Sequence, residues 1–182
     1  MDLKYDLLFK NRTPRPYNLT QAANRLFEAG GSYRVAALLD TGILLSLDRS
    51  VVDLLANRPW ISTNDEVCLF SINESHSEQF ATPFSDEDIL EVSAIPSTTI
   101  SRASVGTPIL FTIQTFVVAV GRFGGMDGST PQVTVSSWWS PRDRAVLGTP
   151  EVWEREIMGS RAHRPRGGGS AYHYAARGLT LP

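Results

Sequence analysis

The chain has 182 residues, 42% of them hydrophobic, and a net charge of −2 because 17 Lys and Arg are set against 19 Asp and Glu. This length suits one ordinary hydrophobic core with ordered arms, and it excludes a second full domain of typical size. The single cysteine, Cys68, excludes an internal disulfide framework and a cysteine-based metal cluster. We therefore expect no cofactor.

In chain order, an extended arm comes first. Residues 1–17 are predicted to be extended because Pro14 and Pro16 remove backbone donors and restrict the residues before them. A single α+β domain is predicted over residues 18–158. Residues 159–182, rich in Arg and Gly, are predicted to form a flexible tail.

Helices are predicted mainly at the start of this domain. Asn18 or Thr20 can cap a helix whose apolar residues recur at helical spacing, and the glycines at 30 and 31 can end it. Residues 33–47 fit either two buried strands around a turn or helical pieces, because apolar runs this short are not separated by periodicity. Short helices are also predicted over residues 50–56 and near 150–158.

The second half of the domain is predicted to be β. Strands are expected over residues 66–72, 89–95, 98–103, 108–120 and 132–139, with a glycine-rich loop between the last two and irregular backbone after them. The order strand, long loop, strand is typical of an antiparallel pair in a sandwich. The predicted fold class is α+β, with a jelly-roll-like antiparallel β-sandwich core over about residues 62–140 and with N-terminal helices and extended terminal arms.

Charge is distributed unevenly along these elements. Residues 59–101 contain eight acids and no Lys or Arg, whereas residues 157–182 contain four Arg and no acid. Opposite charges in separate segments fit a protein that meets other copies of itself or several partners at once. No stretch reaches the roughly 18 uninterrupted apolar residues of a membrane span, and the first residues lack the apolar run of a signal peptide. We expect a soluble protein made in the cytoplasm, with no membrane partner.

One short motif suggests catalysis. Leu38-Leu-Asp40-Thr41-Gly42 resembles the Asp-Thr-Gly element of retroviral-type aspartic proteases. The resemblance implies that Asp40 would share a proton with a symmetry mate and activate water. Here Ile43 follows the glycine, where those proteases have Ala or Ser. Ordinary turn chemistry accounts for the same three residues, so we expect no catalytic residue and keep the protease as an alternative.

A second cluster offers many carboxylate oxygens to a hard cation; its members are Asp86, Glu87, Asp88 and Glu91. Their spacing matches no EF-hand loop. The cluster is interpreted as a solvated loop, with a Ca²⁺ site between subunits or an arginine-binding patch as alternatives, and no metal is assigned.

Interface residues are expected at two further places. Trp138 and Trp139 are neighbours on a strand, so one indole lies on each sheet face and at least one is expected to meet another surface. Arg161, Arg164 and Arg166 are interleaved with glycine and followed by aromatic residues, which suits contacts with carboxylates of a neighbouring subunit or with RNA phosphates.

Residues 107–150 show a pattern of three successive parts, PILFTIQTFVVAV, GRFGGMDGSTP and QVTVSSWWSPRDRAVLGTP. This pattern resembles the end of a picornavirus-like jelly-roll coat protein, where the last two strands are joined by a loop of small residues. The first 60 residues depart from such a protein in being more helical.

The resemblance implies a structural protein of a virus or phage particle, found in the virion. It would serve as a capsid, clamp or cementing subunit, with other capsid subunits or copies of itself as partners, and RNA as a further partner of the tail. It would not be an enzyme. Besides the protease, the alternative is a small intracellular protein-binding module whose partner reads the acidic residues.

Overall fold

The computed structural model describes residues 15–27, 31–63, 65–72, 97–140, 142–162 and 171–174, with backbone only at Ser97 and over 171–174. The strands are β1 Val67–Ser71, β2 Pro108–Ile113, β3 Phe116–Asp127, β4 Thr130–Ser140, β5 Ala145–Gly148 and β6 Ala171–Tyr174. The helices are α2 Leu19–Leu26, α3 Ser32–Asp40, α4 Arg49–Ala56, α6 Ser97–Ile100 and α7 Val152–Ile157. Together they confirm a mixed α+β fold.

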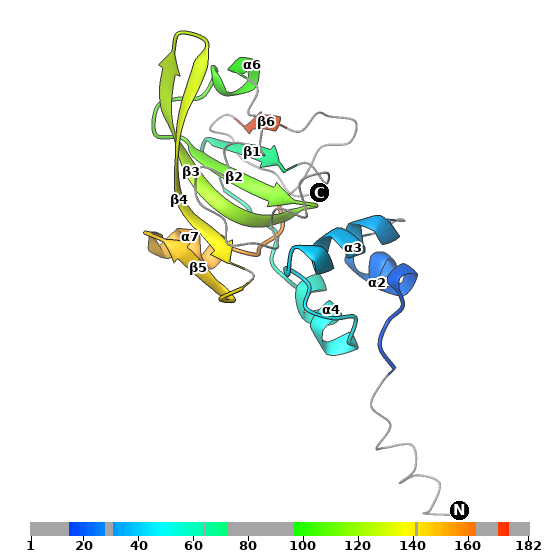
Figure 1. Ribbon diagram of the computed structural model, residues 1–182. Coiled ribbons are helices and arrows are strands. Elements are labelled where there is room, and N and C mark those ends of the chain that lie inside the picture. Colours follow the sequence, from blue (N-terminus) through cyan, green and yellow to red (C-terminus); the bar gives the residue numbers. More distant parts are fainter. Residues whose placement is uncertain are drawn as a thin grey trace, which may run out of the picture.

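The six strands form one sheet in the order β5-β4-β3-β2-β1-β6 (Figure 1). All neighbours are antiparallel except β1 and β2, which run parallel. A jelly-roll sandwich needs two sheets facing each other, and the described residues form a single sheet. The sandwich is therefore not confirmed, and two of the strands, β5 and β6, lie beyond the predicted end of the β core at residue 140.

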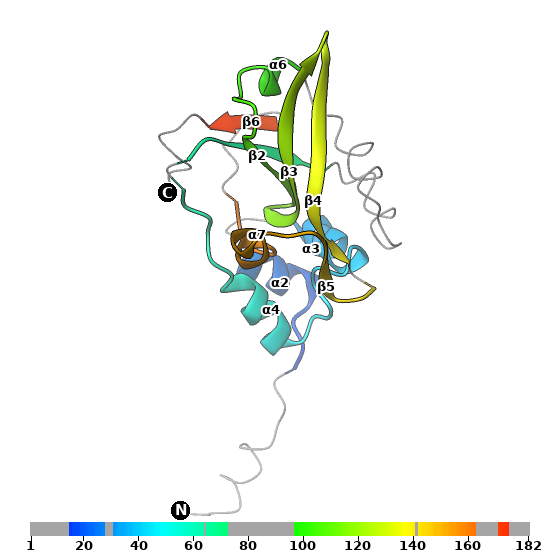
Figure 2. The same cartoon turned by 90° about the vertical axis from the view of Figure 1, so that its left-hand side faces the viewer.

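Both faces of the sheet are covered. One face packs with α2, α3, α4 and α6 through a buried cluster that includes Leu26, Val52, Phe70 and Phe111. The other face packs with α7 and with Ile61 and Ala162. In Figures 1 and 2, α2, α3 and α4 gather beside one end of the sheet, whereas the hairpin of β3 and β4 extends past the other end, beside α6.

Local signals explain the helices that the sequence predicts. Asn18 caps α2, because its side chain accepts a hydrogen bond from the backbone N–H of Gln21 while the Gln21 side chain accepts one from that of Asn18. The predicted helices near residues 50–56 and 150–158 are confirmed as α4 and α7. Residues 33–47 could have been two strands or helical pieces. The structure has a helix there, α3, which covers Ser32–Asp40.

The predicted single strand over residues 108–120 is wrong. A tight turn at Gln114 and Thr115 divides it into β2 and β3, which pair antiparallel. Gln114 has φ 61°, a left-handed conformation in which Asn and Gly are the common residues. The turn was missed because neither residue type signals it.

The predicted glycine-rich loop is also wrong. Gly121, Gly124 and Gly125 lie within β3, next to two register shifts in its pairing with β4. A Cβ at Gly121 would lie 2.9 Å from the Thr134 carbonyl oxygen, so this glycine permits a close approach between strands. The connection itself is only the turn before Thr130, and the antiparallel pairing predicted for these strands is confirmed.

Three more predictions of local structure are corrected. Residues 98–103, predicted as a strand, begin within helix α6 because Ile100 is buried in the core there, and burial overrides β propensity. Residues 145–148, predicted as irregular, form β5 by pairing with β4. Residues 171–174, assigned to a flexible tail, form β6 by pairing with β1. The predicted strand at 89–95 lies outside the described residues.

Candidate functional site

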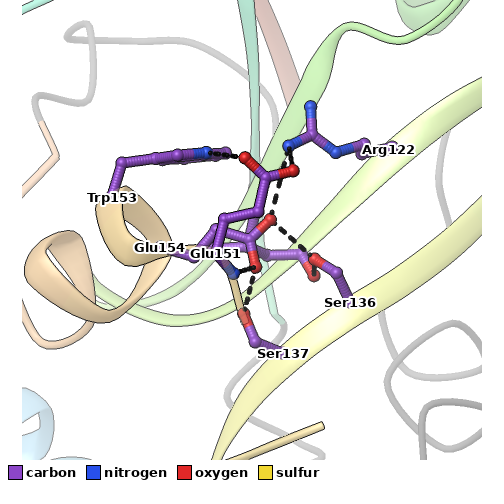
Figure 3. A network of polar contacts seen from close by, with 7 residues as sticks. Arg122, Ser136, Ser137, Glu151, Trp153 and Glu154 are labelled. Atoms are coloured by element: carbon purple, nitrogen blue, oxygen red, sulfur yellow. Dashed lines mark hydrogen bonds and ion pairs between the residues drawn. The ribbon is translucent and has the colours of Figure 1, made fainter. Parts of the chain in front are cut away.

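A network of polar side chains joins α7 to the sheet (Figure 3). The Glu154 side chain is fully buried and accepts hydrogen bonds from Ser136 Oγ at 2.9 Å, from Ser137 Oγ at 3.2 Å and from the backbone N–H of Glu151 at 3.2 Å. Arg122 Nη2 lies 3.6 Å from Glu154 Oε1 and 2.7 Å from Glu151 Oε1. A buried carboxylate with this many donors is well compensated for its loss of water.

Trp153 extends the same network to the surface. Its indole N–H donates to Glu151 Oε2 at 2.8 Å, and the Arg122 guanidinium carbon lies 5.4 Å from the centre of the Trp153 ring. The two serine hydroxyls both donate to a carboxylate that solvent does not reach. The network thus attaches α7 to the sheet, with both serine hydroxyls occupied by hydrogen bonds within the fold.

Arg161 does not lie on a flexible tail, as the sequence had suggested, but in the body of the protein. Its guanidinium donates to the carbonyl oxygens of Leu26 and Ala56, the last residues of α2 and α4. The guanidinium carbon lies 4.4 Å from the centre of the Trp60 ring and 5.5 Å from that of Phe116. A cation at two helix C-termini satisfies carbonyls that lack partners within the helices, so Arg161 joins the helices to the sheet within its own chain.

The two tryptophans lie on opposite faces of the sheet, as predicted. Trp138 packs against the cluster that includes the helices α2 to α4, and Trp139 packs against the cluster that includes α7. Both are partly buried. Their indole nitrogens are buried and have no hydrogen-bond partner among the described residues. Because both rings contribute to the core of their own chain, a role in contacts with another subunit stays a prediction.

The Asp40-Thr41-Gly42 motif forms the end of α3. Asp40 is the exposed last residue of the helix, Thr41 Oγ1 donates to the carbonyl oxygen of Ala37 at 2.8 Å, and Gly42 has φ 66°. A left-handed glycine just after a helix is a common way to end it. Turn chemistry, the favoured interpretation of this motif, therefore accounts for the backbone at all three positions.

Most of the charged residues singled out in the sequence lie outside the described residues; these are Asp86, Glu87, Asp88, Glu91, Arg164 and Arg166. Within the part of the chain that the structure describes, no three His, Cys, Asp or Glu side chains are grouped to hold a metal ion, and no helix is long and apolar enough to cross a bilayer.

Of the two acids in residues 59–101 that the structure describes, Asp65 and Glu66, Glu66 has the clearer structural role. Its carboxylate accepts hydrogen bonds from Thr107 Oγ1 at 2.8 Å and from the backbone N–H of Ser104 at 3.3 Å. Gly106, with φ 91°, donates from its backbone N–H to the Phe123 carbonyl oxygen at 2.7 Å. The loop between α6 and β2 is thus attached to the residue just before β1 and to β3.

This attached loop presents an apolar side chain beside the projecting hairpin. Val105 is 74% exposed and Met126 is 37% exposed. A Cβ at Gly125 would lie 3.6 Å from Val105 Cγ2, so the Val105 side chain lies beside Gly125 of β3, and Met126 is the next residue of that strand. We call Val105, Gly125 and Met126 the ribbon patch. Sequence reasoning missed it because it placed Gly125 and Met126 in a loop.

The backbone beside the ribbon patch is also exposed to pairing. The pairing of β3 with β2 ends at Arg122, and farther along the strand Gly125–Asp127 pair with β4 on one side. Among the described residues, no strand pairs with their other side. A strand edge of this kind can accept a strand from another chain.

The Cys68 thiol has no surface access. Cys68 is buried in β1, and burial, followed by the negative charge of Glu66, raises the pKa of its thiol from 9.0 to about 12. A thiol held protonated is a poor nucleophile. This agrees with the interpretation of Cys68 as a core residue.

Comparison with protein-family models, curated proteins and solved structures finds no match to this chain.

Proposed function

We propose that this chain is a structural subunit of a virus or phage particle, of the clamp or cementing kind. In this role it acts through contacts with other copies of itself or with other coat subunits, and not through catalysis. The observation that carries the proposal is the ribbon patch at the projecting end of β3 and β4.

The ribbon patch has the properties of a contact surface. Apolar side chains scattered singly over a surface are normal, but Val105 lies beside Gly125. Met126 follows Gly125 in β3, whose hairpin with β4 extends past the sheet (Figures 1 and 2). The Gly125–Asp127 edge contains no Lys or Pro, two residues that commonly prevent edge pairing, and its charged residue, Asp127, lies beside the turn into β4. Backbone pairing along this edge, with burial of the two side chains, suits a second copy of the chain or a coat subunit.

The polar side chains that stand out elsewhere support a non-catalytic role. Glu154 and Arg161 are both occupied by contacts that hold helices to the sheet. Thr41 is likewise occupied in ending α3. The carboxylate, the guanidinium and the hydroxyl all make hydrogen bonds within the fold. A substrate would have to replace these hydrogen bonds in order to bind to any of the three groups.

The described strands form a single sheet, which favours a clamp or cementing subunit over a shell-forming jelly roll, because a jelly roll needs two facing sheets. Contacts of Arg164 and Arg166 with carboxylates of a neighbouring subunit, or with RNA phosphates, belong to the same proposal. They would add electrostatic attraction to the apolar contact at the ribbon patch.

The test is the association state of the purified full chain, measured by sedimentation velocity over a range of concentrations. We expect oligomers or particles, and we expect the double substitution Val105→Ser with Met126→Ser to shift the protein to monomers without changing its urea midpoint, because both side chains are exposed.

A matched control replaces two other exposed apolar residues, Leu54 and Val152, with Ser. This control should associate like the unchanged chain. A chain that stays monomeric at every concentration, alone and with candidate coat subunits, would refute the proposal; equal loss of association in the control would refute the assignment to the ribbon patch.

A further inference from the structure

Strand β6 protects the outer edge of β1. The four register pairs run from Val67 with Tyr174 to Phe70 with Ala171. The first four residues of β1 are all buried, so without β6 this strand would expose a hydrophobic edge, the type of edge that pairs readily with other chains. The β1 edge therefore needs a strand beside it, and the last described segment of the chain supplies that strand.

The connection to β6 starts from a fixed point. Ala162 is buried, and its backbone N–H donates to the Thr115 carbonyl oxygen at 2.7 Å. Residues 163–170, between Ala162 and β6, have the sequence His-Arg-Pro-Arg-Gly-Gly-Gly-Ser, a linker-like composition. A connection of this length spans at most roughly 26–29 Å when fully extended, so β6 can pair with a neighbour whose β1 edge lies within that distance of Ala162.

We propose that β6 is an exchangeable strand, which in the assembled protein fills the β1 edge of a second copy of this chain. The same four register pairs form whether β6 comes from its own chain or from a neighbour, so the exchange loses no strand pairing. Local concentration then decides the outcome, as in other exchanges of identical elements. This inference rests on the proposed function, because assembly supplies the high local concentration.

The register provides a direct test, since Cys68 is the only cysteine and pairs with His173. Paired residues on adjacent strands lie within the Cα separation that a disulfide spans. His173→Cys should therefore form a disulfide with Cys68 of whichever chain provides β1. The full-length variant is refolded in a glutathione redox buffer, first dilute and then at high concentration, and its monomer and oligomer fractions are run on non-reducing denaturing gels.

We expect disulfide-linked dimers in the oligomer fraction and single chains with an internal disulfide in the dilute monomer fraction. The matched control is Ile109→Cys, because Ile109 pairs with Cys68 from β2 on the other side of β1. Both β1 and β2 come before residues 163–170, so they stay together in one chain when β6 is exchanged. This control should therefore yield only internal disulfides in both fractions.

A second variant covers the case in which His173→Cys does not fold. Deletion of Gly167–Gly169 shortens the connection, which should disfavour pairing within one chain and increase the oligomer fraction. Oligomers with only internal disulfides, or an unchanged oligomer fraction after the deletion, would overturn the exchange and leave the proposed function standing. Absence of oligomers in the unchanged chain would overturn both.

Discussion

At the scale of single residues, Arg161 shows how strongly context changes the meaning of a charge. In the sequence it belongs to a basic stretch with Arg164 and Arg166, whereas in the structure its side chain connects two helix ends to an aromatic pair. A buried guanidinium of this kind is worth more to folding than to association, because its removal leaves helix carbonyls without donors.

We predict that Arg161→Met lowers the free energy of unfolding by about 2–4 kcal/mol, since methionine keeps an apolar stem but loses the hydrogen bonds to Leu26 and Ala56. Urea denaturation followed by tryptophan fluorescence measures this loss. The exposed Arg155 supplies the control, as Arg155→Met should change stability by no more than about 0.5 kcal/mol. Equal stability of the two variants would contradict the role assigned to Arg161.

Cys68 leads to a prediction about pH. The thiol keeps its proton up to a pKa of about 12 when folded and loses it near 9.0 when unfolded. Between these values the folded state binds more protons than the unfolded state, so this group makes stability fall as pH rises above about 9. Cys68→Ala removes the group, and the stability of the unchanged chain relative to this variant should decline between pH 8 and pH 11.

Chemical denaturation of both proteins across that pH range shows whether the stability difference between them falls or rises with pH. All other titrating groups are shared, so the difference reports on Cys68. A parallel measurement is the rate of iodoacetamide labelling, which should be slow in the folded chain at pH 8 and fast in urea. Rapid labelling of the folded protein would mean that Cys68 is accessible, contrary to its burial.

At the scale of elements, α7 is too short to be stable without tertiary contacts. Its six residues are held by the buried Glu154, which reaches Ser136 and Ser137 on β4. The helix is thus a consequence of its attachment to the sheet, although its capping signal is local.

We predict that Glu154→Gln destabilises the protein by about 1–3 kcal/mol, because an amide replaces one acceptor with a donor and removes the charge that faces Arg122. Hydrogen exchange should become faster over Val152–Ile157 than over Leu19–Leu26. The control is Glu156→Gln on the exposed side of the same helix, for which we expect no measurable change. Uniform acceleration along the chain would argue against a local attachment.

At the scale of the whole molecule, the sheet is covered on both faces by different parts of the chain. Val117 and Val118 are neighbours in β3, yet Val117 belongs to the cluster with α7 and Val118 to the cluster with α2, α3 and α4. Both are almost fully buried. The ribbon patch and the β6 edge are the places where, by our proposals, this two-sided body meets other copies.

We predict that Val117→Ala and Val118→Ala each destabilise the protein by about 1–3 kcal/mol, through lost burial and the cavities left behind. Thermal unfolding of the two single variants compares how much each face of the sheet contributes to stability, at neighbouring positions of one strand. A neutral Val117→Ala would mean that the α7 face is open to solvent, and the two-sided core would then be wrong.

Much of the fold was predictable because its signals are local. The hydrogen bonds of Asn18 at the start of α2 involve a residue three positions away, and the alternation of residues along β4 is visible within a few positions. Strands β1 and β4 and the helices α2, α4 and α7 follow from such signals. The turn-forming character of Asp-Thr-Gly at the end of α3 does so as well.

Tertiary structure alone decided the helical state of Ile100 and the pairing of β6 with β1, because each depends on partners distant in the chain. The turn at Gln114 that divides residues 108–120 is local, but its residue types do not signal it. Tertiary structure likewise decided that Arg161 is internal, through contacts with Leu26 and Ala56 that are 135 and 105 residues away. By itself the sequence determined an α+β chain and its uneven charge. Where its exposed edges and apolar patch lie was set by packing, since burial is a property of distant neighbours and not of spacing.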